Sequence, residues 1–110
     1  DKELKNCISQ NFMTTDMNNC TYKAIELWNK EITNYTKQIE KSINKENYIL
    51  LQETQLAWDD YYKKEQKLQN NTLGQIFGDI HTTYVVGNLY DITKQRAVFL
   101  KSYLYQINEK

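Results

Sequence analysis

Residues 47–68 read NYILLQETQLAWDDYYKKEQKL, and their spacing sets the architecture predicted for the whole chain. One set of side chains recurs every three or four residues, which is the period of one face of an α-helix: Tyr48, Leu51, Gln55, Trp58, Tyr62 and Glu65. A second ridge one position away widens this stripe: Thr54, Ala57, Tyr61 and Leu68. We therefore predict that this helix is the middle of a bundle and touches two neighbours.

Two further long helices are predicted on either side of it. The first covers about residues 15–42, with Thr14 or Thr15 as its N-cap. The polar residues 44–47 then turn the chain in a few residues, so the next helix returns antiparallel to the first. Residues 70–78, which contain Gly74 and Gly78, are expected to form the longer connection. The last helix covers roughly residues 81–107 and contains Gly87, where a glycine often marks a close helix crossing.

The predicted fold class is all-α, an antiparallel bundle of three long helices plus a short N-terminal helix or segment. The absence of proline and the presence of only three glycines leave few forced breaks in the backbone. At 110 residues the chain has the length of one domain, residues 1–110.

Charge and hydropathy exclude several classes of partner. Fourteen basic and fourteen acidic residues cancel, with a pI near 6.8, so no nucleic acid or anionic membrane partner is expected. No apolar run approaches the roughly 20 residues that cross a bilayer, so we expect no membrane span. The chain opens at Asp1 instead of Met, which indicates a processed or trimmed N-terminus.

The two cysteines lie in the first third of the chain. A Cys7–Cys20 disulfide would close about 14 residues and contribute roughly 3 kcal/mol. From spacing alone, a disulfide and two buried free thiols remain equally open. A closed zinc site is not expected, because the chain has one histidine and no second cysteine pair.

No constellation in the sequence indicates catalysis, and we expect neither an enzyme nor a cofactor. His81 has no nucleophilic Ser or Cys near it in sequence and is expected to be a surface or helix-start residue. Asp59 and Asp60 are adjacent, so on a helix they point about 100° apart and form no paired carboxylate site. They are expected on a solvated face.

Four residues on the stripes are assigned structural roles: Trp28, Gln55, Trp58 and Arg96. Trp28 and Trp58 lie on the stripes of antiparallel helices and are expected in the core. Arg96 interrupts the apolar seam of the last helix, between Ile92 and Phe99. A buried guanidinium without a partner would cost several kcal/mol. We therefore expect an inter-helix carboxylate beside it, either Glu31 or Glu65.

A set of residues spread over nearly the whole chain resembles the lysozyme inhibitor LprI N-terminal domain family. The set comprises Cys7, residues 15–17, Cys20, residues 27–32, Gln55, Trp58, Tyr61, Gly78, Thr93, Arg96 and Leu100. The resemblance implies a small secreted or periplasmic bacterial helical bundle whose signal sequence has been removed. It also implies that Cys7 and Cys20 pair, since that compartment is oxidising. A second cysteine pair of the family corresponds to Gln66 and Asn88, so that bridge is absent here.

The resemblance implies that the chain binds another protein, and we expect it to do so as a monomer. Lysozyme as the target follows from the family name alone, since a net charge of zero gives no obvious attraction to a strongly basic enzyme. An immunity or adaptor protein with a different bacterial partner is the alternative. Among residues 72–84 we predict Phe77 and Tyr84 as binding anchors. The open alternative is that they only cap the bundle, in which case Tyr61 and Tyr62 are the next candidates.

Overall fold

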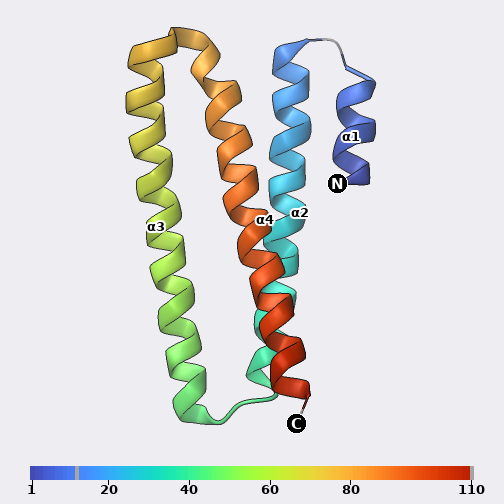
Figure 1. Ribbon diagram of the computed structural model, residues 1–110, viewed down its shortest axis with the longest axis vertical. Coiled ribbons are helices and arrows are strands. Elements are labelled where there is room, and N and C mark those ends of the chain that lie inside the picture. Colours follow the sequence, from blue (N-terminus) through green and yellow to red (C-terminus); the bar gives the residue numbers. More distant parts are fainter. Residues whose placement is uncertain (12, 110) are drawn as a thin grey trace.

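The structure is a computed structural model that describes residues 1–11 and 13–109. It contains a short helix α1 (Lys2–Ser9) and three long helices, α2 (Thr14–Glu40), α3 (Lys45–Phe77) and α4 (His81–Asn108). A 3₁₀ turn, η1 (Gly78–Ile80), joins α3 to α4, and no strand occurs among the described residues. Successive long helices are antiparallel (Figure 1). The predicted all-α bundle of three long helices with a short N-terminal helix is therefore confirmed.

The ends of the helices differ from the prediction in two places. Helix α2 has Met13 as its N-cap and no side-chain capping bond, so the predicted cap at Thr14 or Thr15 is wrong. Both threonines already lie in the first turn. Helix α3 continues to Phe77, so the long connection predicted at residues 70–78 is also wrong. Gly74 is tolerated inside the helix, and the chain turns only at Gly78, whose φ of 65° favours glycine.

The start of α3 follows the predicted polar turn. Asn44 is the N-cap, and its side-chain oxygen accepts a hydrogen bond from the backbone N–H of Asn47 at 2.8 Å. This bond satisfies one of the backbone donors that every helix start leaves unpaired. Because the turn is short, α3 runs back antiparallel to α2.

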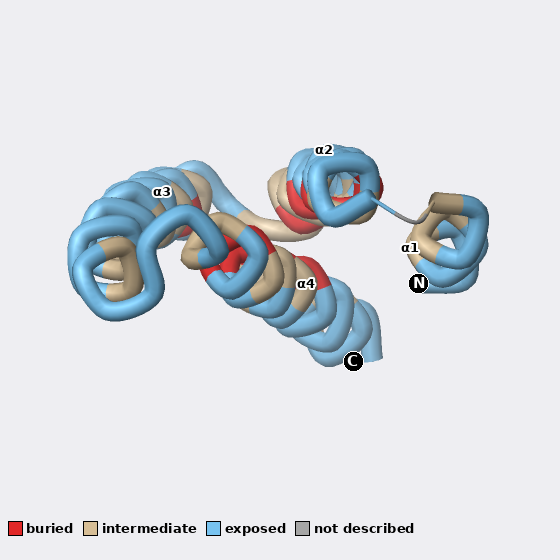
Figure 2. Tube along the Cα trace, turned by 90° about the horizontal axis from the view of Figure 1, so that it is seen from above, coloured by how far each residue is buried: buried red, intermediate tan, exposed pale blue. Residues whose placement is uncertain are grey.

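Helix α4, and not α3, is the middle helix, which corrects the prediction. Helix α4 packs against both α2 and α3, whereas α2 and α3 barely touch (Figures 1 and 2). The reason lies in the side chains. Helix α4 buries a broad face that includes the small residues Thr93 and Ala97, whereas α3 buries only Leu51. The second ridge of α3 is exposed, because its stripe meets one neighbour instead of two.

The core consists of two clusters along α4. The lower one, near the α2–α3 turn, contains Ile32, Ile39, Leu51, Ala97 and Leu100. The upper one, near η1, contains Ile25, Val85, Val86 and Leu89. The Cα trace measures 48 × 30 × 15 Å. The bundle is therefore thin, and many large apolar side chains stay at its surface.

Gly87 does not mark a helix crossing. A Cβ added to Gly87 would meet no atom within 4 Å, so no neighbouring helix makes this glycine necessary. The glycine with a close neighbour is Gly74, where an added Cβ would lie 3.7 Å from the His81 ring. That contact is an ordinary one, and it packs the end of α3 against the start of α4.

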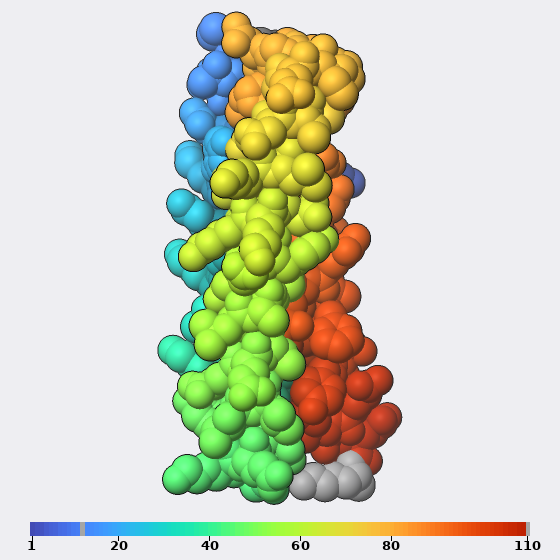
Figure 3. All heavy atoms as spheres, turned by 90° about the vertical axis from the view of Figure 1, so that its left-hand side faces the viewer, coloured from blue at the N-terminus to red at the C-terminus, as the bar shows by residue number. Residues whose placement is uncertain are grey.

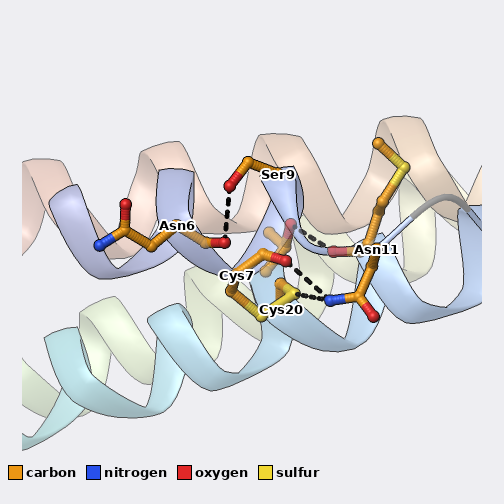
Figure 4. The surroundings of a disulfide bond; sticks show 7 residues. Asn6, Cys7, Ser9, Asn11 and Cys20 are labelled. Carbon is orange, nitrogen blue, oxygen red and sulfur yellow. Dashed lines mark hydrogen bonds between the residues drawn. A yellow bond between two sulfur atoms is a disulfide. The ribbon is translucent and has the colours of Figure 1, made fainter.

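Helix α1 lies beside α2, on the side away from α3 (Figures 1 and 2), and buries no residue. A disulfide joins Cys7 of α1 to Cys20 of α2, with their Cα atoms 5.7 Å apart (Figure 4). The side-chain amide of Asn11 donates to the carbonyl of Cys7 at 2.7 Å and reaches Sγ of Cys20 at 3.6 Å. At the other end of α1, Asp1 binds Lys94 and Tyr90 of α4. The disulfide and these polar contacts hold α1 in place.

Candidate protein-binding surface

The α3–α4 connection carries an exposed apolar surface, which we call the tip surface: Ile76, Phe77, Ile80 and Tyr84. The structure brings Phe77 and Tyr84 together, with ring centroids 5.1 Å apart and planes tilted by 40°. Phe77 is 45% exposed and Tyr84 is 50% exposed. Ile76 and Ile80 are more exposed still, at 69% and 59%. About half or more of each of these residues is therefore exposed to solvent.

The backbone under the tip surface is braced from two sides. His81 starts α4, and its Nδ1 lies 2.7 Å from the carbonyl oxygen of Gly78. The side-chain amide of Asn18, near the start of α2, donates to the hydroxyl of Thr83 at 3.2 Å. The tip is thus a helical hairpin turn with side-chain ties to its surroundings. Little conformational entropy would be lost there on binding.

The segment that carries the tip surface contains acidic but no basic side chains. No Lys or Arg occurs anywhere in residues 69–93, which contain Asp79 and Asp91. The chain as a whole is neutral, so its basic residues are concentrated elsewhere. Acidic side chains near a contact surface favour a basic partner and raise its association rate. The overall net charge conceals this asymmetry.

The two fallback tyrosines are not equivalent. Tyr61 is exposed on the second ridge of α3. Tyr62 is partly buried, packs against the upper core cluster and lies 5.4 Å from the Trp58 ring. Burial raises the pKa of Tyr62, an effect that the Thr93 hydroxyl partly offsets. Tyr61 therefore remains accessible, whereas Tyr62 is part of the helix packing.

Arg96 finds a partner on another helix, but not the predicted carboxylate. Its Nε and Nη2 donate to the same side-chain oxygen of Gln55 on α3, at 3.2 and 3.1 Å. Neither Glu31 nor Glu65 is its acceptor; Glu65 accepts from Gln69 of its own helix instead. Gln55 lies one turn from the Asp59 carboxylate and donates to it at 3.3 Å. Burial lowers the pKa of Arg96, and the nearby charge of Asp59 raises it.

The two tryptophans lie at the edges of the lower core cluster. Trp28 and Trp58 are both partly buried and pack against its members. Lys94 lies 5.9 Å from the centroid of the Trp28 ring, at a distance where a cation–π contact contributes about 0.5–1 kcal/mol at an exposed site.

Two grooves were not expected from the sequence. One, of about 600 Å³, lies between α1 and α2 around Leu4, Leu27 and Trp28. Its rim mixes lysines with Asp1, Glu3 and Glu31, so it selects no sign of charge. The other, of about 280 Å³, lies in the lower half of the bundle between α3 and α4. Phe99 and Tyr103 of α4 are exposed on its wall, although Phe99 continues the apolar seam of that helix.

Neither a metal-ligand cluster nor a membrane-spanning helix is found among the described residues. In residues 1–11 and 13–109, no three His, Cys, Asp or Glu side chains gather as a metal site. None of the helices in this part of the chain is long and apolar enough to cross a bilayer. Asp60 pairs with Lys64 at 2.9 Å, while Asp59 accepts from Gln55. The adjacent carboxylates therefore serve separate contacts.

Comparison with known proteins gives one match. The family model described as lysozyme inhibitor LprI matches residues 7–100. No curated protein and no solved structure matched the chain. The match includes the disulfide, the three long helices up to Leu100 and the tip surface.

Proposed function

The chain belongs to the lysozyme inhibitor LprI family, and from that membership we propose that it acts outside the cytoplasm by binding a protein through the tip surface. A lysozyme is the first partner to test. The observation that carries the choice of surface is the exposed pair of Phe77 and Tyr84 on a braced turn. Aromatic side chains dominate binding energy at protein interfaces and lose little rotamer freedom there.

The charge distribution supports a basic partner for this surface. Lysozyme is strongly basic, and residues 69–93 carry Asp79 and Asp91 without any Lys or Arg. Attraction between such surfaces acts mainly on the association rate and weakens as salt is added. The aromatic pair would then supply the affinity, and the carboxylates would orient the approach.

The Cys7–Cys20 disulfide supports the location. Disulfides persist in oxidising compartments such as the periplasm or the extracellular medium. A reducing compartment would break this bond. Because helix α1 buries no residue, it would then be held only by its polar contacts. The disulfide therefore supports action outside the cytoplasm.

The test is a binding and inhibition assay with a lysozyme. We expect Phe77→Ala and Tyr84→Ala each to weaken binding at least tenfold, which corresponds to about 1.4 kcal/mol. Tyr105→Ala is the matched control, because Tyr105 is an exposed aromatic near the opposite end of α4. It should change affinity less than twofold.

The result also separates the two kinds of partner. If lysozyme is neither bound nor inhibited, the chain should be used to capture proteins from the periplasmic fraction. A captured protein whose binding falls with Phe77→Ala would indicate an adaptor or immunity role through the same surface. If both alanine variants bind lysozyme within a factor of two of the unmodified chain, the tip surface is not the site, and Tyr61 is tested next.

A further inference from the structure

The smaller groove has a mostly apolar lining and a single cation, and we call it the lower groove. It lies far from the tip surface along α3 and α4. Its floor and walls come from three helices: Ile39, Ile43, Asn47, Leu50, Leu51, Thr54, Arg96, Phe99, Leu100 and Tyr103. Figure 3 looks onto the outer face of α3 and shows the last turns of α4 beside the first turns of α3.

The walls of the lower groove leave apolar area uncovered. Leu50 on α3 is 53% exposed, and Phe99 on α4 is 60% exposed. Phe99 and Tyr103 stack with ring centroids 6.5 Å apart and planes only 10° from parallel. Each apolar group that a ligand covered here would contribute roughly 25 cal/mol per Å² removed from water.

Arg96 supplies the charge at one end of the groove. Its guanidinium lies 6.0 Å from the centroid of the Phe99 ring. Two of its nitrogens are engaged by one neutral amide oxygen, that of Gln55, and no ion pair of Arg96 occurs among the described residues. A guanidinium has five N–H donors arranged to match a carboxylate. Donors therefore remain for an anion that enters the groove.

We propose that the lower groove binds a medium-chain fatty acid, with its carboxylate on Arg96 and its hydrocarbon chain along Leu50, Phe99 and Tyr103. Arg96 is the one charged residue that lines the groove, so the lining complements a single negative charge; the Asp59 carboxylate, whose charge also acts on Arg96, lies outside the lining. Arg96 and Tyr103 are seven positions apart on the helix, which corresponds to about 10 Å. That length and a volume of about 280 Å³ suit an extended chain of moderate size.

The polar groups of the groove disfavour a peptide as the occupant. A buried peptide backbone needs partners for its N–H and C=O groups. Besides Arg96, only Asn47, Thr54 and Tyr103 carry polar side chains here, and the Thr54 hydroxyl already donates to the Leu51 carbonyl at 2.7 Å. A hydrocarbon chain makes no such demand. This proposal does not depend on the proposed binding of lysozyme.

The test measures binding of decanoate by calorimetry at neutral pH, below its micelle concentration. Decanol and decyltrimethylammonium have the same chain with a neutral or a cationic head. We expect one molecule of decanoate per protein, decanol to bind at least tenfold more weakly, and the cation not to bind. A charge-assisted hydrogen bond supports a difference of this size. Equal binding of decanoate and decanol, or no binding of decanoate, would overturn the proposal.

Substitutions locate the site. Arg96→Gln should weaken decanoate at least tenfold and leave decanol unchanged. Arg96 also packs between helices, so its replacement could disturb the fold. Phe99→Ala is therefore a second variant, because the exposed Phe99 side chain is dispensable for folding. It should weaken decanoate binding at least fivefold. Val98→Ala is the matched control, since Val98 is 50% exposed on the same helix and does not line the groove. If Phe99→Ala and Val98→Ala bind equally well, or if a peptide ending in Leu-Leu binds and decanoate does not, the assignment is wrong.

Discussion

Arg96 on α4 and Gln55 on α3 are joined by two hydrogen bonds to one oxygen atom, at 3.2 and 3.1 Å. This contact holds the guanidinium at the apolar seam between the two helices. It also gives α3 a polar attachment to α4 next to Leu51, the one residue that α3 buries. The stability of the α3–α4 packing should therefore depend on Gln55.

Replacing Gln55 by Leu should lower the free energy of unfolding by about 1–3 kcal/mol, because it leaves the partly buried guanidinium without its acceptor. Urea denaturation followed by circular dichroism measures the change. Gln66→Leu, at an exposed position of the same helix, is the control and should stay within about 0.5 kcal/mol. The double variant Gln55→Leu with Arg96→Met should recover most of the loss. No recovery would show that Gln55 acts by a route other than Arg96.

Gly78 and Gly87 should respond in opposite directions to substitution by Ala. Gly78 has φ 65° and ψ −139°, a conformation open almost only to glycine, so Gly78→Ala should cost about 1–3 kcal/mol. Gly87 is helical and has no atom within 4 Å of an added Cβ, so Gly87→Ala should stabilise by up to about 1 kcal/mol. Thermal unfolding of the two variants decides the matter. A destabilised Gly87→Ala protein would indicate a contact absent from the monomer.

Reduction of the Cys7–Cys20 disulfide should release α1 and leave the three long helices folded. The bridge spans a sequence separation of 13, for which loop closure alone predicts about 3 kcal/mol. Helix α1 buries no residue, however, so the reduced native state also gains freedom, and the global loss should be smaller than that figure. Hydrogen exchange should show lost protection in residues 2–9 with the core of α4 unchanged. Loss of protection throughout α4 would contradict this view.

Stability should fall when the pH rises above about 10, the ordinary pKa of tyrosine. Burial raises the pKa of Tyr62 in the folded state, so the unfolded chain loses this proton first. The stabilising contribution is therefore present below pH 10 and is lost as the pH rises through the folded pKa. Tyr62→Phe should lose less unfolding free energy than the unmodified chain when the pH rises. Urea denaturation between about pH 8 and pH 11, the range in which an ordinary tyrosine titrates, measures this loss. The exposed Tyr61→Phe protein should lose stability as the unmodified chain does.

The helices themselves could be predicted from the sequence because their apolar positions recur with the helical period and no proline interrupts them. The choice of middle helix could not. The stripe on α3 includes Gln55, Glu65 and the second ridge, and periodicity alone does not distinguish a face that is buried from one that is only apolar. The buried face of α4 includes the small residues Thr93 and Ala97, and Ala97 packs with Ile32 and Ile39 of α2 and Leu51 of α3.

Of the two candidate binding surfaces, one could be predicted from the sequence and the other could not. Phe77 and Tyr84 could be singled out because two glycines and several apolar residues lie together in one short segment, and the structure does place their rings side by side. The lower groove could not be anticipated. It combines residues of α2, α3 and α4 that are up to about 60 positions apart in sequence, and it exists only because Phe99 and Tyr103 project beside α3 instead of into the core.

The central position of α4 has a consequence for how the chain is made. Synthesis delivers α2 and α3 before α4, yet these two helices barely touch each other. Until residues 81–108 emerge, the apolar faces of both lack the surface that covers them, and isolated helices hold together poorly in water. A fragment of residues 1–80 should accordingly show far less helix by circular dichroism than its share of the intact protein. We therefore expect α2 and α3 of the growing chain to become stably packed only once residues 81–108 have been made.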